Sequence, residues 1–292
     1  MKAINAILIT TIVLGMGHAA GATTRYLASS GGDQTAQLQT LINQSVPYDT
    51  IVIQAGNHYF NGTVNQPVDH LTLSGASGAQ MLKLNTSSVA VLDGRGNYAS
   101  YTGIYIDGAN RPEPCMRLFG SNCQLVNCTF RNSANTGLLI DHSNNNNIQS
   151  CFCYYNNICG ISQWASSGNT IQNCQLHDNG AEGLTIDGGS NNCQVYGNWI
   201  HANNGPQHGV GGIGIDASNG ANIHNNTIDY NGLNGVTLQN NLCCGCDGVN
   251  VHDNPNISYN QNWACYRNTR QPNTNFGWSN NTCTGNGVGV LF

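Results

Sequence analysis

Apolar residues return along the middle of the chain at a nearly constant interval, in short stretches that open with glycine and alternate with polar residues. The first clear stretch is Gly137-Leu138-Leu139-Ile140-Asp141, and the glycines that open the series are Gly137, Gly160, Gly183, Gly212 and Gly235. Successive glycines are 23, 23, 29 and 23 residues apart. Alternation of this kind is typical of a β-strand with one buried face. The pattern therefore predicts one such strand in every repeat.

Each repeat contains a second apolar segment, which we expect to be another strand. Its first apolar position holds Leu125, Ile148, Ile171, Val195 and Ile223, and the position five residues on holds Phe130, Cys153, Leu176, Ile200 and Ile228. Between them runs a column of thiol and amide side chains, formed by Cys128, Cys151, Cys174, Asn198 and Asn226. A further column before the next glycine consists of Asn156, Asn179, Asn203 and Asn231. Asparagine tolerates the left-handed backbone of tight turns, and stacked amides can bond along a column.

A single coil of two or three short strands cannot bury its apolar side alone. Coils stacked about 4.8 Å apart pair every strand with its neighbours and enclose a continuous core. We therefore predict an all-β chain that folds as a single-stranded, right-handed parallel β-helix. Residues one repeat apart in the sequence then become neighbours along the rod.

The first part of the chain departs from the repeat. Thr35–Asn43 is predicted to be a short amphipathic helix with Leu38, Leu41 and Ile42 on one side. Such a helix would cap the open edge of the first coil, which would otherwise invite aggregation. Asp49–Ile53 is predicted to be the first strand of the β-helix.

Residues 1–22 have the form of an export signal. Lys2 precedes the apolar run Ile4–Leu14, and the small residues Ala19–Ala22 follow it. The run is too short to span a bilayer, and no later segment approaches the length of a membrane helix. We expect the signal to be removed, which leaves one β-helix domain over residues 23–292 that is secreted.

Charged residues are scarce. They make up 8% of the chain, with a formal net charge of −5, against about 25% in an average soluble domain. Beyond the signal segment, Lys83 is the only lysine. Nucleic acid is excluded as a partner, because phosphate binding relies on clustered Lys and Arg.

Thirteen cysteines in an exported chain favour disulfide bonds, and the odd number leaves at least one thiol over. Cys128, Cys151 and Cys174 fall on successive coils, where either one neighbouring pair bonds or all three stay buried thiols. The cysteines expected to staple the C-terminal loop, with a zinc site as the alternative, are Cys243, Cys244, Cys246 and Cys265.

These repeats resemble the pectate-lyase-like superfamily of right-handed parallel β-helix proteins. Tyr26–Asp33 with Asp49–Gly56 is similar to the opening coil of that group, Val91–Gly96 to an early turn of its carbohydrate enzymes, and Gly137–Leu238 to its generic repeat. The resemblance covers nearly all of the chain after the signal. It implies the fold but no single activity, because lyases, hydrolases, epimerases and non-catalytic proteins share these repeats.

The residue pattern at Asn169–Cys174 and His177–Asn179 is most similar to that of the family-nine pectate lyases. The resemblance implies a lysine base beside a calcium ion that aspartates hold. The chain departs from that pattern, because Lys83 lies in an early coil and no dense aspartate cluster is visible. A lyase would here need Arg131 or a histidine as its base.

The fourth position after each repeat glycine is predicted to project outward as a ladder of Asp141, Trp164, Asp187, Asp216 and Gln239. Asp187 and Asp216 would lie about 4.8 Å apart on adjacent coils. Two carboxylates so close raise each other's pKa or hold a cation, and calcium is the natural one. Trp164 offers a face for sugar stacking, and Asp141 would contact the same substrate. The alternative is that these aspartates cap turns.

The long repeat owes its length to the insertion Gly205–Gly209, which carries His208. Inserted loops carry function more often than repeats, and histidine acts as acid or base near neutral pH. The alternative is an exposed loop histidine. A second outward column would bind an acidic sugar or be only a solvated face, and it holds Arg131, Tyr154, His177, His201 and Asp229.

Together these features favour a secreted, monomeric carbohydrate-active protein that acts on an acidic polysaccharide such as pectate or alginate. In a polysaccharide lyase, a base removes the proton α to the uronate carboxylate while calcium or Arg131 stabilises the charge. In a glycoside hydrolase on the same fold, Asp187 and Asp216 would form the catalytic pair. A non-catalytic cell-surface or adhesive rod is the alternative from a different class.

Overall fold

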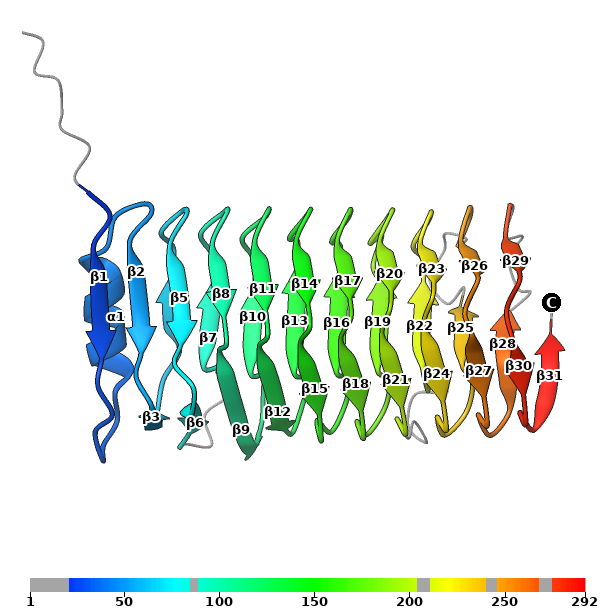
Figure 1. Ribbon diagram of the computed structural model, residues 1–292, viewed down its shortest axis with the longest axis horizontal. Coiled ribbons are helices and arrows are strands. Elements are labelled where there is room, and N and C mark those ends of the chain that lie inside the picture. Colours follow the sequence, from blue (N-terminus) through cyan, green and yellow to red (C-terminus); the bar gives the residue numbers. More distant parts are fainter. Residues whose placement is uncertain (1–20, 85–88, 204–210, 240–245, 268–274, 292) are drawn as a thin grey trace, which may run out of the picture.

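The computed structural model describes residues 21–84, 89–203, 211–239, 246–267 and 275–291. Within these residues the chain is almost entirely β, with one short helix and three parallel sheets of eleven, ten and ten strands. Figure 1 shows the strands of successive coils side by side along one long axis, from β1 at one end to β31 at the other. The predicted right-handed parallel β-helix is confirmed. No helix in the described ranges combines the length and the apolar character that a bilayer span requires.

Every regular coil contributes one strand to each sheet, in the order sheet C, sheet A, sheet B. Sheet A consists of β1 (Thr24–Leu27), β2 (Thr50–Ile53), β5 (Thr72–Gly75), β8 (Ser100–Thr102), β11 (Gln124–Val126), β14 (Asn147–Gln149), β17 (Thr170–Gln172), β20 (Gln194–Tyr196), β23 (Asn222–His224), β26 (Asn250–His252) and β29 (Gly277–Ser279). Sheet B consists of β3 (Gly56–Phe60), β6 (Ala79–Lys83), β9 (Tyr105–Arg111), β12 (Thr129–Ser133), β15 (Phe152–Tyr154), β18 (Gln175–His177), β21 (Trp199–His201), β24 (Thr227–Asp229), β27 (Asn256–Ser258) and β30 (Cys283–Thr284). Sheet C consists of β4 (Val64–Gln66), β7 (Leu92–Gly94), β10 (Met116–Leu118), β13 (Leu138–Asp141), β16 (Ile161–Trp164), β19 (Leu184–Asp187), β22 (Ile213–Asp216), β25 (Val236–Gln239), β28 (Trp263–Arg267) and β31 (Val288–Leu291).

The repeat sets the register of sheet C. Leu138 pairs with Ile161, and Ile161 pairs with Leu184 on the following coil. All three side chains are fully buried, and the alternate residues of these strands face outward. Identical phases therefore stack into one continuous apolar core, as the 23-residue period predicts.

The second apolar segment of each repeat is two strands and not one. In the coil that contains β14 and β15, the chain bends at Ser150, whose φ is 53°, so that Ile148 belongs to sheet A and Cys153 to sheet B. The same left-handed bend recurs at Asn127 and Asn173. The sequence pattern does not reveal the bend, because both flanking strands bury their apolar residues in the same core.

The capping helix is confirmed as α1 (Thr35–Asn43), with Leu38 and Ile42 buried and Leu41 packed against the core. The predicted first strand is corrected, since β1 precedes the helix and pairs with β2. The buried carboxylate of Asp49 ties the two segments together, because it binds the guanidinium of Arg25 at 2.5 Å and accepts the backbone N–H of Thr23.

The column between sheets A and B is a ladder inside the rod. The backbone N–H of Cys151 points at Sγ of Cys174 at 3.4 Å, and that of Cys174 donates to Oδ1 of Asn198 at 2.9 Å. Cys128, Cys151 and Cys174 are all buried thiols, which is one of the two alternatives. The described residues form no disulfide bond with one another, so the expected staple is not found there, and Cys243 and Cys244 lie outside them.

Candidate functional site

A cleft of about 370 Å³ opens over the outer face of sheet C. It crosses β16, β19, β22 and β25 together with the turns that lead into β16 and β19. Its lining residues are Ile158, Cys159, Ser162, Glu182, Thr185, Ile186, Asp187, Gly214, Ile215, Asp216 and Gln239. The ionisable side chains in this set are the carboxyl groups of Asp187, Asp216 and Glu182 and the thiol of Cys159.

The predicted ladder lies at the ends of the sheet C strands. Trp164 pairs in register with Asp141 on one side and with Asp187 on the other, and Asp216 pairs with Gln239. Asp187 and Asp216, which end β19 and β22, both line the cleft. Asp141 lies two coils before Asp187, outside the cleft lining, where its carboxylate binds Nδ1 of His142 at 2.6 Å.

The Asp187 carboxyl group is tuned by its position. Burial raises its pKa above the ordinary aspartate value, the backbone N–H of Gly188 lowers it by donating to Oδ1, and the charge of Asp216 raises it further, with the upward effects prevailing. Asp187 therefore caps its turn, as the alternative interpretation has it, and also presents a carboxyl group to the cleft. Its proton is held to a higher pH than that of an exposed aspartate.

Trp164 lies against the turn that follows Asp187. A Cβ atom at Gly188 would stand 2.8 Å from Cδ2 and 2.9 Å from Cε2 of the indole, and φ of Gly188 is 64°. Glycine satisfies both conditions, since it has no Cβ and adopts the left-handed region freely. The indole stays 42% exposed, one coil from Asp187.

Glu182 and Cys159 were missed by the sequence interpretation. Each directly precedes a repeat glycine, and each side chain is only 5% exposed. Sγ of Cys159 lies 3.2 Å from Oε2 of Glu182. Burial and the charge of Glu182 raise the pKa of the Cys159 thiol well above its ordinary value, so the thiol donates to the carboxylate. One signal in the sequence could have identified Glu182, because it is the only acidic residue among those that directly precede the five repeat glycines.

Arg131, His177 and His201 lie on another face. They belong to β12, β18 and β21 of sheet B, in one register column with Tyr154 and Asp229. The structure thus brings Asp187 and Asp216 together and places Arg131, His177 and His201 away from them on sheet B.

Each of these sheet B cations and imidazoles has an acidic partner. The Arg131 guanidinium pairs with Asp107 at 2.9 Å. Nδ1 of His177 lies 2.8 Å from Asp178, and Nδ1 of His201 lies 2.9 Å from Asp229. His208 lies outside the described residues.

The residues of the cleft do not fit a preformed calcium site. Calcium takes six to eight oxygen ligands, and the described ranges contain no group of three or more His, Cys, Asp or Glu residues that could hold a metal ion. Asp187 and Asp216 supply two carboxylates, and burial raises the pKa of Asp187, which weakens its hold on a cation. Calcium binding by Asp187 and Asp216 stays a prediction.

Comparison with known proteins decides the family. A family model described as "Right handed beta helix region" matches residues 59–241. The chain belongs to the right-handed β-helix family. No curated protein sequence matches this chain.

Solved structures share the fold of this β-helix protein at low identity. Pectate lyase Pel9A superposes with a TM-score of 0.61 at 16% identity, over 91% of this chain and 78% of that one. The family 28 exopolygalacturonase of Yersinia enterocolitica gives 0.64 at 14%, over 92% and 66%, and the surface adhesin PfbA of Streptococcus pneumoniae gives 0.59 at 12%, over 92% of each. The chain spans 61% of the length of ORF18 of Geobacillus virus E2, which gives 0.60 at 13%. At these identities the likeness concerns the fold alone.

Proposed function

We propose that this β-helix protein hydrolyses glycosidic bonds of a polysaccharide that lies along the cleft on sheet C. The observation that carries the proposal is the pair of carboxyl groups of Asp187 and Asp216 on adjacent coils, with the pKa of Asp187 raised by burial. Glycoside hydrolysis uses one protonated carboxyl group and one carboxylate on either side of the scissile bond.

The two aspartates divide the chemistry between them. Asp187 donates its proton to the glycosidic oxygen as the bond to the leaving sugar breaks. Asp216 supplies the carboxylate that stabilises the positive charge of the oxocarbenium-like transition state and activates water or attacks the anomeric carbon. Trp164 offers its exposed indole face to a neighbouring sugar ring, beside the acid.

Hydrolysis is favoured over the lyase reaction by what lines the cleft. The described lining residues include three carboxyl groups and no lysine, arginine or histidine. β-Elimination needs a base that removes a proton next to a uronate carboxylate, and Arg131 is held on sheet B by Asp107. A lyase would have to use a cleft carboxylate, which is a weak base, or take its base from His208, which lies outside the described residues. Negative charge in the cleft also opposes a uronate polymer unless a cation bridges the two.

Export and a monomeric state are part of the same proposal. A polysaccharide substrate lies outside the cell, residues 1–22 have the form of an export signal, and one protein of similar fold is described as a surface adhesin. The same likeness supports the second candidate function, a non-catalytic adhesive rod. Sedimentation of the secreted chain tests the monomer.

The experiment measures products on a panel of uncharged and uronate polysaccharides. New reducing ends without ultraviolet absorbance of an unsaturated sugar are expected, and Asp187→Asn or Asp216→Asn should each lower the rate by at least about a hundredfold. Asp253→Asn, an exposed aspartate beside β26 of sheet A, is the control. Unsaturated products would establish the lyase instead. A full panel without any product would favour the adhesive rod.

A further inference from the structure

A row of rings runs along the outer face of sheet B, away from the cleft. We call it the aromatic band and define it as Tyr154, His177, Trp199, His201, Tyr230 and Tyr259. These residues come from five successive coils, those of β15, β18, β21, β24 and β27. Four steps of about 4.8 Å between coils make the band roughly 19 Å long, parallel to the rod axis.

Each ring of the band contacts the next. The centroid separations from Tyr154 onward are 5.1, 6.0, 4.8, 5.4 and 4.9 Å. The planes of Tyr154 and His177 are within 3° of parallel, and those of Tyr230 and Tyr259 within 12°. Stacked carbons touch at about 3.5 Å, which is less than the coil spacing, so parallel rings on adjacent coils must lean over one another. Among the rings of the band, Trp199, Tyr230 and Tyr259 are 40%, 55% and 53% exposed.

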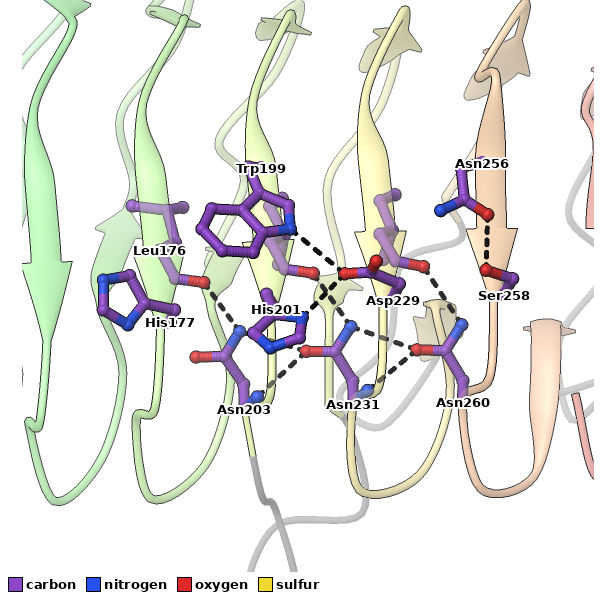
Figure 2. Close-up of polar contacts among 12 residues, drawn as sticks. Leu176, His177, Trp199, His201, Asn203, Asp229, Asn231, Asn256, Ser258 and Asn260 are labelled. Carbon is purple, nitrogen blue, oxygen red and sulfur yellow. Dashed lines mark hydrogen bonds and ion pairs between the residues drawn. The ribbon is translucent and has the colours of Figure 1, made fainter. Parts of the chain in front are cut away.

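The centre of the band is fixed by Asp229. Its Oδ1 accepts from Nε1 of Trp199 at 3.2 Å and from Nδ1 of His201 at 2.9 Å, across the gap between β21 and β24. Figure 2 shows both bonds converging on this carboxylate, with the buried amides of Asn203, Asn231 and Asn260 bonded in a row beneath. The indole N–H is therefore occupied, while 40% of Trp199 stays exposed. A surface held in this way loses little conformational freedom when a ligand binds.

Charge on this face is matched locally. Arg131, next to Tyr154, is paired with Asp107. Any positive charge on His177 or His201 faces the carboxylate of Asp178 or Asp229. Polyanions such as nucleic acids and uronate polymers gain nothing from such a surface, because they bind through unpaired cations.

We propose that the aromatic band binds a single chain of an uncharged polysaccharide, which lies along the rod axis with a sugar ring against Trp199. A pyranose ring has apolar C–H faces and a rim of hydroxyl groups. The band offers tilted aromatic faces, and the Asp229 carboxylate and the imidazoles supply hydrogen-bond partners at their edges. A row roughly 19 Å long and one ring wide also covers much less area than the roughly 800 Å² per partner that a stable protein interface buries. The inference concerns binding and stands without the hydrolysis proposed for sheet C.

The chain offers a matched control. Tyr230 and Tyr98 are both 55% exposed, have φ of 54° and 55°, and are each stacked on another ring with a centroid separation of 4.9 Å, while Tyr230 also has the His201 ring edge-on at 5.4 Å. Tyr230 belongs to the band, whereas Tyr98 precedes β8 of sheet A. Substituting either tyrosine by alanine removes the same ring from the same kind of backbone.

The test is native gel electrophoresis of the full chain in gels that contain hydroxyethylcellulose, mixed-linkage β-glucan or galactomannan, with polygalacturonate and alginate as charged probes. At least one uncharged polymer should retard the protein. Trp199→Ala and Tyr230→Ala should each weaken that affinity roughly two- to tenfold, the factor that corresponds to one aromatic contact. Tyr98→Ala should match the wild type. Asp187→Asn should be retarded as well, which shows that the retardation does not require cleavage in the sheet C cleft, while the losses in Trp199→Ala and Tyr230→Ala assign it to the band.

Several outcomes would overturn the proposal. They are no retardation by any uncharged polymer, retardation by the uronate polymers alone, or equal effects of Tyr98→Ala and Tyr230→Ala. A dimer in sedimentation that Trp199→Ala dissociates would also overturn it, because a second copy would then cover the band. Circular dichroism of each variant confirms that the β-helix is intact.

Discussion

The contact between Gly188 and Trp164 gives the sharpest prediction about the cleft. In Gly188→Ala the new Cβ would stand 2.8 Å from Cδ2 of the indole. Ordinary carbon contacts are about 3.5 Å, so the indole must move by about 0.7 Å or rotate away. The substitution also places alanine at φ 64°, which destabilises the fold by about 1–2 kcal/mol.

Gly189→Ala separates these two effects. The φ of Gly189 is 86°, yet no atom lies within 4 Å of the Cβ that alanine would add there, so this variant carries backbone strain without touching the indole. Both variants should lose similar stability in thermal unfolding. We expect only Gly188→Ala to shift the fluorescence of Trp164 and to raise KM on a polymeric substrate, by about two- to tenfold if one sugar stacks there.

Equal KM values for the two glycine variants would refute the reasoning. So would a Trp164→Ala variant that binds and cleaves the polymer as the wild type does. Either result would mean that the exposed indole is not part of the substrate path, and that the strain at Gly188 serves the turn alone.

Three further predictions concern the pH response and the core. Folding raises the pKa of Asp187, so between the ordinary aspartate pKa and the raised value the folded chain binds more protons than the unfolded chain. The free energy of unfolding should therefore fall as the pH rises through this window. Denaturation measured at several pH values should show that Asp187→Asn lacks this fall. Asn203→Ala removes a buried amide that donates to Leu176 O at 2.8 Å and accepts from Asn179 Nδ2 at 2.9 Å, so chemical denaturation should show a loss of about 2–4 kcal/mol, against little change for the exposed Asn157→Ala. Cys128, Cys151 and Cys174 should resist maleimide in the native protein and react after denaturation; a mass corresponding to a disulfide between any two of them would contradict the buried thiols.

The sequence predicts the β-helix well because residues one repeat apart pair in register on adjacent coils, so stacking requires a periodic sequence. Gly137, Gly160 and Gly183 set a register that the sheet C pairings reproduce, and the amphipathic helix at Thr35–Asn43 has the predicted bounds. The bend at Ser150 and the pairing of β1 with β2 escape prediction. The bend depends on the φ of one turn residue, and the pairing of β1 with β2 joins segments on either side of the capping helix, so the apolar periodicity determines neither.

The candidate site is only partly visible in the sequence for a similar reason. Asp187 and Asp216 share a phase, so their adjacency follows from the repeat. Glu182 belongs to a different phase and reaches the cleft through the turn before Gly183, where its carboxylate contacts the thiol of Cys159. Arg131 has a phase of its own, and only the position of sheet B places it on another face.

The central claim is that a polysaccharide is cleaved between Asp187 and Asp216 on sheet C. A crystal structure of Asp187→Asn with an oligosaccharide of a cleaved polymer tests it most directly. The account predicts a sugar in the cleft, with its glycosidic oxygen within hydrogen-bond reach of the side chain at position 187 and a neighbouring ring on Trp164. An oligosaccharide whose scissile bond lies against other residues, or one that leaves the cleft empty, would contradict it.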